Sequence, residues 1–197
     1  MILLIIHTKQ YVNSCLDIIF KKSRINMKFL AISLLLMSSL IASISNINSF
    51  EADFTQTITD DKSKVLSYNG HVSAVKPQVA LWSYTTPVNK NVYINTYEVT
   101  IVEPEIEQVI VKRLESNFSF FNMIKNAKKI DKNTYEAFYK SSKFIIVMEN
   151  ESIKSISYVD EFENNVKIVF KNQKTNKTID KNIFIPKFSL DFDVIRD

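Results

Sequence analysis

The stretch from Ser49 to Thr59, SFEADFTQTIT, decides how this chain folds. Its side chains alternate between two environments. One face is apolar apart from a glutamine and the other is polar: Phe50, Ala52, Phe54, Gln56 and Ile58 against Glu51, Asp53, Thr55, Thr57 and Thr59. A period of two over this length predicts a β-strand with one face in a core and the other in water.

The same pattern continues toward the C-terminus. Strands are predicted over 64–74, 79–85, 91–95, 98–102, 108–114, 134–140, 144–149, 153–159, 166–171 and 182–186, with a tail to 194. Residues 115–129 interrupt it, because Phe118, Phe121 and Ile124 recur at the spacing of an amphipathic helix. Short strands joined by brief polar turns predict an antiparallel sheet that is large enough to curl.

Toward the N-terminus, residues 27–45 have the layout of a secretory signal peptide. Met27 and Lys28 form a basic start, an apolar run extends from Phe29 to Ala42, and small residues follow. An uncleaved anchor is the alternative, but the run is short of the ~20 apolar residues that a span needs. We interpret residues 1–26 as a non-native extension, expect cleavage of the signal peptide and export to the periplasm, and expect residues 46–197 to form a single domain.

Composition excludes several functions. The formal charge is +4, but the surplus lies in the first 42 residues, and the chain from Ser43 onward has equal numbers of acidic and basic residues. A neutral domain lacks the basic surface of a nucleic-acid-binding protein, so no nucleic-acid partner is expected. Gly70 is the only glycine, which excludes glycine-rich phosphate-binding loops.

The residues of the expected mature chain do not indicate catalysis. They include one histidine, His71, and no cysteine, since Cys15 lies in the leader. A catalytic histidine needs a nucleophile or a carboxylate beside it, and the local sequence supplies neither. A zinc site needs clustered histidines, cysteines or carboxylates. We therefore expect no enzyme activity, no metal and no cofactor.

Aromatic residues are the positive signal, with 14 Phe and 8 Tyr. A plain aromatic core is one interpretation. The other is a curled sheet whose concave face forms an apolar, lipid-binding cavity under a helical lid. The residues predicted to form this cavity are Phe50, Phe54, Trp82, Tyr84, Tyr93, Phe118, Phe121 and Ile124. Phe54, Trp82 and Tyr84 should face the cavity while Glu51, Asp53 and Ser83 face water, and residues 118–124 should form a mobile lid.

Four blocks of the sequence resemble the LolA family of outer-membrane lipoprotein carriers. They are SFEADFTQ at 49–56, KPQVALWSYTTP at 76–87, EPEIEQ at 103–108, and the closing segment from 184–186 to 193–195. They occur in the family's order and span nearly all of the predicted domain. Lys76 stands where the family carries an arginine, and Asn95-Thr96-Tyr97 replaces a glycine-containing turn.

The resemblance implies an α+β, mainly β fold: an open, incomplete antiparallel barrel whose hydrophobic cavity is covered by short helices. It implies a monomeric periplasmic chaperone that takes the acyl chains of lipoproteins from an inner-membrane ABC transporter to the outer membrane, and to a receptor there if one exists. Lys76 would take the arginine's part in lid contacts and cargo release.

Two alternatives to the carrier remain at the level of sequence. One is a lipid- or glycolipid-binding module of the same fold with a regulatory or transport role. The other is an enzyme with an apolar substrate, which would need a carboxylate or a Ser–His pair inside the cavity.

Overall fold

The computed structural model describes residues 46–114 and 119–196, all within one compact unit, Ser43–Asp197. The predicted extension at 1–26, the predicted signal peptide at 27–45 and Phe118 of the predicted lid lie outside the described residues. No helix in the described part of the chain is long and apolar enough to cross a membrane.

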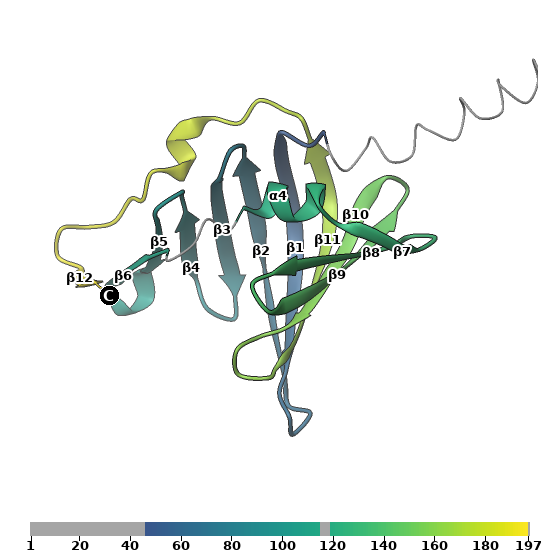
Figure 1. Ribbon diagram of the computed structural model, residues 1–197. Coiled ribbons are helices and arrows are strands. Elements are labelled where there is room, and N and C mark those ends of the chain that lie inside the picture. Colours follow the sequence, from purple (N-terminus) through teal and green to yellow (C-terminus); the bar gives the residue numbers. More distant parts are fainter. Residues whose placement is uncertain (1–45, 115–118, 197) are drawn as a thin grey trace, which may run out of the picture. The chain divides into compact units, whose positions relative to one another are not determined.

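The described residues form one open sheet of 12 strands (Figure 1). Its strands are β1 (Ser49–Thr59), β2 (Val65–Val75), β3 (Val79–Thr86), β4 (Lys90–Ile94), β5 (Glu98–Glu103), β6 (Gln108–Arg113), β7 (Lys128–Asp131), β8 (Thr134–Tyr139), β9 (Ser142–Glu149), β10 (Ser152–Val159), β11 (Asn165–Thr175) and β12 (Asp193–Arg196). The prediction of a mainly β protein is confirmed. Helices are few among these residues: α4 (Phe120–Lys125), η1 (Pro104–Ile106) and η2 (Lys181–Phe184). The α part of the predicted α+β label is therefore small.

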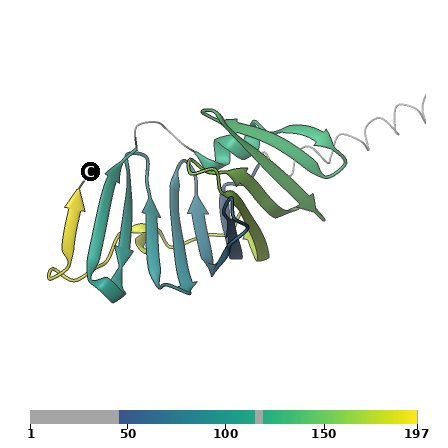
Figure 2. The same ribbon diagram turned by 90° about the horizontal axis from the view of Figure 1, so that it is seen from below.

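The sheet is curved, and its two edges stay apart. The spatial order runs β12-β6-β5-β4-β3-β2-β1-β11-β10-β9-β8-β7, so β12 and β7 are the edges. Seen from below, β8, β9 and β10 turn away from the row formed by β12 and β2–β6 (Figure 2). This curvature gives the sheet an inner face, which α4 covers in part, and an outer face.

Strand β1 lies near the middle of the sheet and follows the predicted alternation. It pairs with β2 and with β11, which places Phe54 opposite both Gly70 and Phe170. Phe50, Ala52 and Phe54 are almost fully buried on the inner face. Burying a phenylalanine stabilises a fold by roughly 1.5–3 kcal/mol, so this strand anchors the main core.

The C-terminal region departs from the sequence prediction. The expected strand at 182–186 is the 3-10 helix η2, and β12 pairs in parallel with β6, which breaks the expected all-antiparallel arrangement. After β11 the chain crosses the sheet to reach β12 at the far edge (Figure 1). Phe192 in this crossing packs on a second cluster formed by Tyr93, Val102 and Val109.

The predicted helix at 115–129 is also too long. Helix α4 begins after Ser119, whose hydroxyl accepts a hydrogen bond from the Asn122 backbone N–H at 3.3 Å, and it ends at Lys125. Lys128–Asp131 instead forms the edge strand β7, because its backbone pairs with β8. Pairing with a distant strand overrides the local helical pattern there.

Candidate functional site

An apolar cavity of about 410 Å³ lies on the inner face. Its walls come from β1–β4, from β8–β11, and from three residues of α4: Phe120, Phe121 and Met123. The volume falls within the roughly 300–1,000 Å³ of small-molecule sites. Among the described residues, the lining consists of aliphatic, methionine and aromatic side chains plus two glutamines, Gln56 and Gln78, and includes no charged residue, serine or histidine.

A chain of aromatic contacts fixes the cavity wall. The Phe50 ring lies 5.4 Å from Phe170 and 5.8 Å from Phe120, measured between ring centroids. Trp82 lies 6.4 Å from Phe170 and 5.0 Å from Phe54, with the latter pair edge to face. Such geometries favour fixed ring orientations, so β1, β3, β11 and α4 are held together around the cavity.

Four of the predicted cavity residues line it: Phe50, Trp82, Tyr84 and Phe121. Phe54 and Ile124 do not; both are buried in the core that surrounds it. Phe54 supports the wall, since its ring contacts both Trp82 and Tyr84.

The placement of Tyr93 in the cavity was wrong. Its neighbours Val92 and Ile94 line the cavity, so the alternation of β4 turns Tyr93 to the outer face. There it joins the cluster beneath Phe192.

The sequence prediction also missed the opposite wall, which β9–β11 supply. Phe144, Ile156, Tyr158, Ile168 and Phe170 all line the cavity. A signal was present in β11, because residues 166–171 place apolar side chains at every second position, whereas residues 144–149 form a continuous apolar run that does not distinguish the two faces.

One end of the cavity is polar. The Tyr84 hydroxyl donates a hydrogen bond to Gln56 Oε1 at 2.8 Å. The Lys90 ammonium lies 4.8 Å from the centroid of the Tyr84 ring and 5.5 Å from that of Tyr68. Burial, with smaller contributions from Tyr158 and Tyr68, raises the pKa of Tyr84 to about 12, so its hydroxyl stays protonated and remains a donor.

Helix α4 and the turn between β2 and β3 meet at the other end. The Ser119 hydroxyl donates to the Pro77 carbonyl oxygen at 3.3 Å. Lys76 Nζ donates to Asn48 Oδ1 at 3.1 Å and lies 5.9 Å from the Phe121 ring centroid. The structure therefore places Lys76 beside the helix that the sequence analysis identified as a lid.

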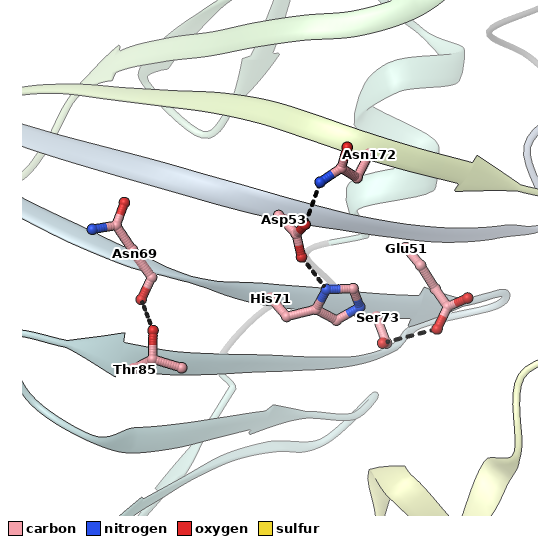
Figure 3. Close-up of polar contacts among 7 residues, drawn as sticks. All are labelled: Glu51, Asp53, Asn69, His71, Ser73, Thr85 and Asn172. Carbon is pink, nitrogen blue, oxygen red and sulfur yellow. Dashed lines mark hydrogen bonds and ion pairs between the residues drawn. The ribbon is translucent and has the colours of Figure 1, made fainter.

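The outer face carries a polar cluster that the sequence analysis did not identify (Figure 3). Asp53 Oδ1 lies 2.8 Å from His71 Nδ1, and Asn172 Nδ2 donates to Asp53 Oδ2 at 2.7 Å. The sequence near His71 supplies no carboxylate; the one beside it comes from the neighbouring strand β1, where Asp53 pairs opposite His71. Hydrogen bonds from Asn172 and then from His71 lower the pKa of the Asp53 carboxyl. The cluster occupies the face opposite the cavity, so it cannot act on a ligand held there.

Fold and cavity together define a class of protein: a curved, open β-sheet that encloses an apolar, ligand-sized cavity beneath a short helix. The profile of the family described as "Outer membrane lipoprotein carrier protein LolA" matches residues 45–187. The chain belongs to this family, as the sequence blocks indicated.

Individual relatives agree with the family assignment. The chain is similar to the outer-membrane lipoprotein carrier protein of Campylobacter jejuni, with 40% identity over 169 residues that cover 86% of this chain and 99% of the relative. Proteins of the same name from Wolinella succinogenes and Helicobacter hepaticus are 32% and 30% identical, over 79% and 77% of this chain and 91% and 86% of the relatives.

Proposed function

We propose that this protein is a periplasmic chaperone that holds the acyl chains of lipoproteins in its apolar cavity. It carries them from an inner-membrane ABC transporter to the outer membrane. The observation that supports this most directly is the uncharged cavity of about 410 Å³. The names of its relatives point to lipoproteins as the cargo.

Physical chemistry favours such a container. Each CH₂ group of an acyl chain gains roughly 0.8 kcal/mol on leaving water, so a lipoprotein cannot cross an aqueous compartment unaided. A carrier must also release what it binds, which requires part of the wall to move. Helix α4 suits that part because it has only six residues and contributes Phe120, Phe121 and Met123 to the wall.

Lys76 is the candidate release residue. Its contacts with Asn48 and Phe121 connect the start of the domain with α4. We expect Lys76→Leu to leave acyl binding intact and to slow delivery to outer-membrane vesicles, and Lys76→Arg to deliver as well as the native protein or better. A Lys76→Leu protein with unchanged delivery would remove Lys76 from the mechanism.

The proposed function is tested by adjacent substitutions on the two faces of β3. Trp82 lines the cavity, whereas Ser83 belongs to the outer face. Because a carboxylate in an apolar site is strongly unfavourable, Trp82→Glu should weaken binding of a fluorescent fatty acyl probe at least roughly tenfold. Ser83→Glu should bind the probe like the native protein.

Native co-purification complements the binding test. Mass spectrometry of material purified from the periplasm should identify triacylated lipoproteins. Lipid without attached protein would instead indicate a lipid- or glycolipid-binding module. Acyl binding that is equal in both β3 variants would contradict a role for the cavity.

A further inference from the structure

Gln78 has an unusual position among the described residues. Its side-chain Nε2 is buried and has no hydrogen-bond partner there. Gln78 also lines the cavity. A buried donor without an acceptor is costly, and native proteins rarely keep one without a reason.

The surroundings of Gln78 place this donor at the α4 end of the cavity. Gln78 belongs to the turn between β2 and β3, one residue before Val79. The carbonyl of the preceding residue, Pro77, accepts the hydrogen bond from Ser119 at the start of α4. The side-chain carbonyl oxygen of Gln56, the other lining glutamine, already accepts from Tyr84, toward the opposite end.

We propose that the Gln78 side chain donates a hydrogen bond to an ester or amide carbonyl oxygen of the bound lipid. This inference rests on the proposed function and adds a specificity-determining residue to it. A ligand can supply the acceptor, because the other side chains that line the cavity near this turn, such as Val79, Ala80 and Phe121, offer no acceptor atom.

The contact sets the direction of the ligand. Its carbonyl groups lie at the β2–β3 turn and α4, and its hydrocarbon extends toward Trp82, Phe144 and Tyr158. A plain alkyl chain would fill the same apolar volume but leave the Gln78 donor unpaired. The cavity therefore distinguishes acyl lipids from other hydrocarbons.

The test compares two fluorescent probes that differ only in their carbonyl groups: a diacylglycerol and the dialkyl ether of the same chain length. The native protein should prefer the ester by roughly tenfold, the ratio that one hydrogen bond supplies. Gln78→Met keeps the side-chain length and removes the donor, so it should bind both probes equally. It should also melt at the same temperature as the native protein or higher, because it removes an unpaired group.

Gln56→Met is the matched control, since it replaces the other cavity glutamine. It should melt at a lower temperature, because the Tyr84 hydroxyl loses its acceptor, and it should retain the preference for the ester. A triacylated lipopeptide serves as a third probe. If Gln78→Met loses more affinity for the lipopeptide than for the diacylglycerol, the lipoprotein terminus is the source of the carbonyl. If it loses more affinity for the diacylglycerol, a membrane glycerolipid is the source.

The outcomes separate this inference from the proposed function. A native protein that binds ester and ether equally well overturns the role of Gln78 and leaves the acyl carrier intact. The inference also fails if Gln78→Met retains the preference. A native protein that binds neither the probes nor the lipopeptide overturns both.

Discussion

Tyr84 is a residue at which the apolar cavity meets a polar end. In the folded protein the pKa of Tyr84 is about 12, above its ordinary value of 10.0. The contribution of the neutral side chain to folding stability is therefore fully present below pH 10.0 and is lost as the pH rises toward 12. Tyr84→Phe keeps the ring and should lose less stability over this interval. At neutral pH it should be less stable by roughly 1 kcal/mol, because the bond to Gln56 is gone.

Urea unfolding of both proteins at neutral pH and across the alkaline interval measures this difference. The Phe variant serves as its own control for the other tyrosines, since they titrate in both proteins. Parallel loss of stability in the two proteins above pH 10.0 would show that Tyr84 does not titrate as described.

Gly70 of β2 is required because the Phe54 ring of β1 and the Ser83 carbonyl of β3 both lie close to its Cα. A Cβ atom there would lie 2.2 Å from the Ser83 carbonyl oxygen and 2.7 Å from Cζ of Phe54. We expect Gly70→Ala to destabilise the fold by roughly 1–3 kcal/mol, because backbone and ring must both shift. Ser67→Ala, at an exposed position of the same strand, is the control and should change the melting temperature little. Equal melting temperatures for the two variants would contradict the clash.

Residue positions were predictable where alternation alone decides them. The faces on which Phe50 and Trp82 lie follow from the alternation of their strands. Tyr93 is aromatic, but the alternation of β4 places it on the face away from the cavity. The contact between Asp53 and His71 depends on the register of β1 against β2, which places the two residues opposite each other. Register is a property of a strand pair and cannot be read from either strand alone.

At the scale of elements, α4 is the segment most dependent on its cap. Ser119→Ala removes the bond to the Asn122 N–H and the bond to the Pro77 carbonyl. Loss of a serine N-cap costs about 1 kcal/mol, which is large for a helix of this length. Amide hydrogen exchange in 120–125 should become several-fold faster, and ligand should slow it in both proteins.

The matched control for the cap is Asn122→Ala. Asn122 is exposed, and the substitution keeps its backbone N–H while improving helix propensity, so exchange should be unchanged or slower. Strong protection of α4 that is identical with and without ligand would contradict the mobile lid.

Element types were predictable for the long strands and less so for the short segments. Helix α4 was expected to continue to Lys129, but the backbone of Lys128–Asp131 finds a partner in β8. Asn182–Pro186 contains three consecutive apolar residues, yet it lies where no strand is free to pair, and η2 forms instead. In both cases a distant partner, or its absence, decided the structure.

At the scale of the molecule, the C-terminal crossing should stabilise the sheet without forming the cavity. Truncation after Lys187 removes Phe192 and β12, exposing the cluster of Tyr93, Val102 and Val109 and leaving β6, still paired with β5, as the edge of the sheet. We expect a loss of roughly 1–3 kcal/mol of stability and, at low temperature, unchanged affinity for the acyl probe, because none of the described residues after 187 lines the cavity.

Leu190→Ser is the control for this truncation, since Leu190 is 99% exposed and its replacement should have no effect on melting. If the truncated protein loses acyl binding under conditions where circular dichroism shows it folded, the C-terminal crossing does contribute to the cavity and the prediction fails.

The sheet order was not available from the sequence. Hairpin neighbours such as β4 and β5 follow from short turns, but the pairing of β1 with β11 and the parallel pairing of β12 with β6 join segments far apart in the chain. The parallel pair needs the long crossing between β11 and β12, which carries little periodicity of its own.

The pairing of β1 with β11 also affects how the chain folds over time. Phe54 cannot meet Phe170 until nearly the whole polypeptide has been synthesised. Contacts between such distant segments slow folding, because the entropy of closing the loop is lost before any contact forms. A ribosome-released fragment that ends before Asn165 would display one side of β1 as an unpaired edge, a template for intermolecular β-pairing. Chains that end before Asn165 should therefore aggregate, whereas in a chain that includes β11 the edge of β1 is paired.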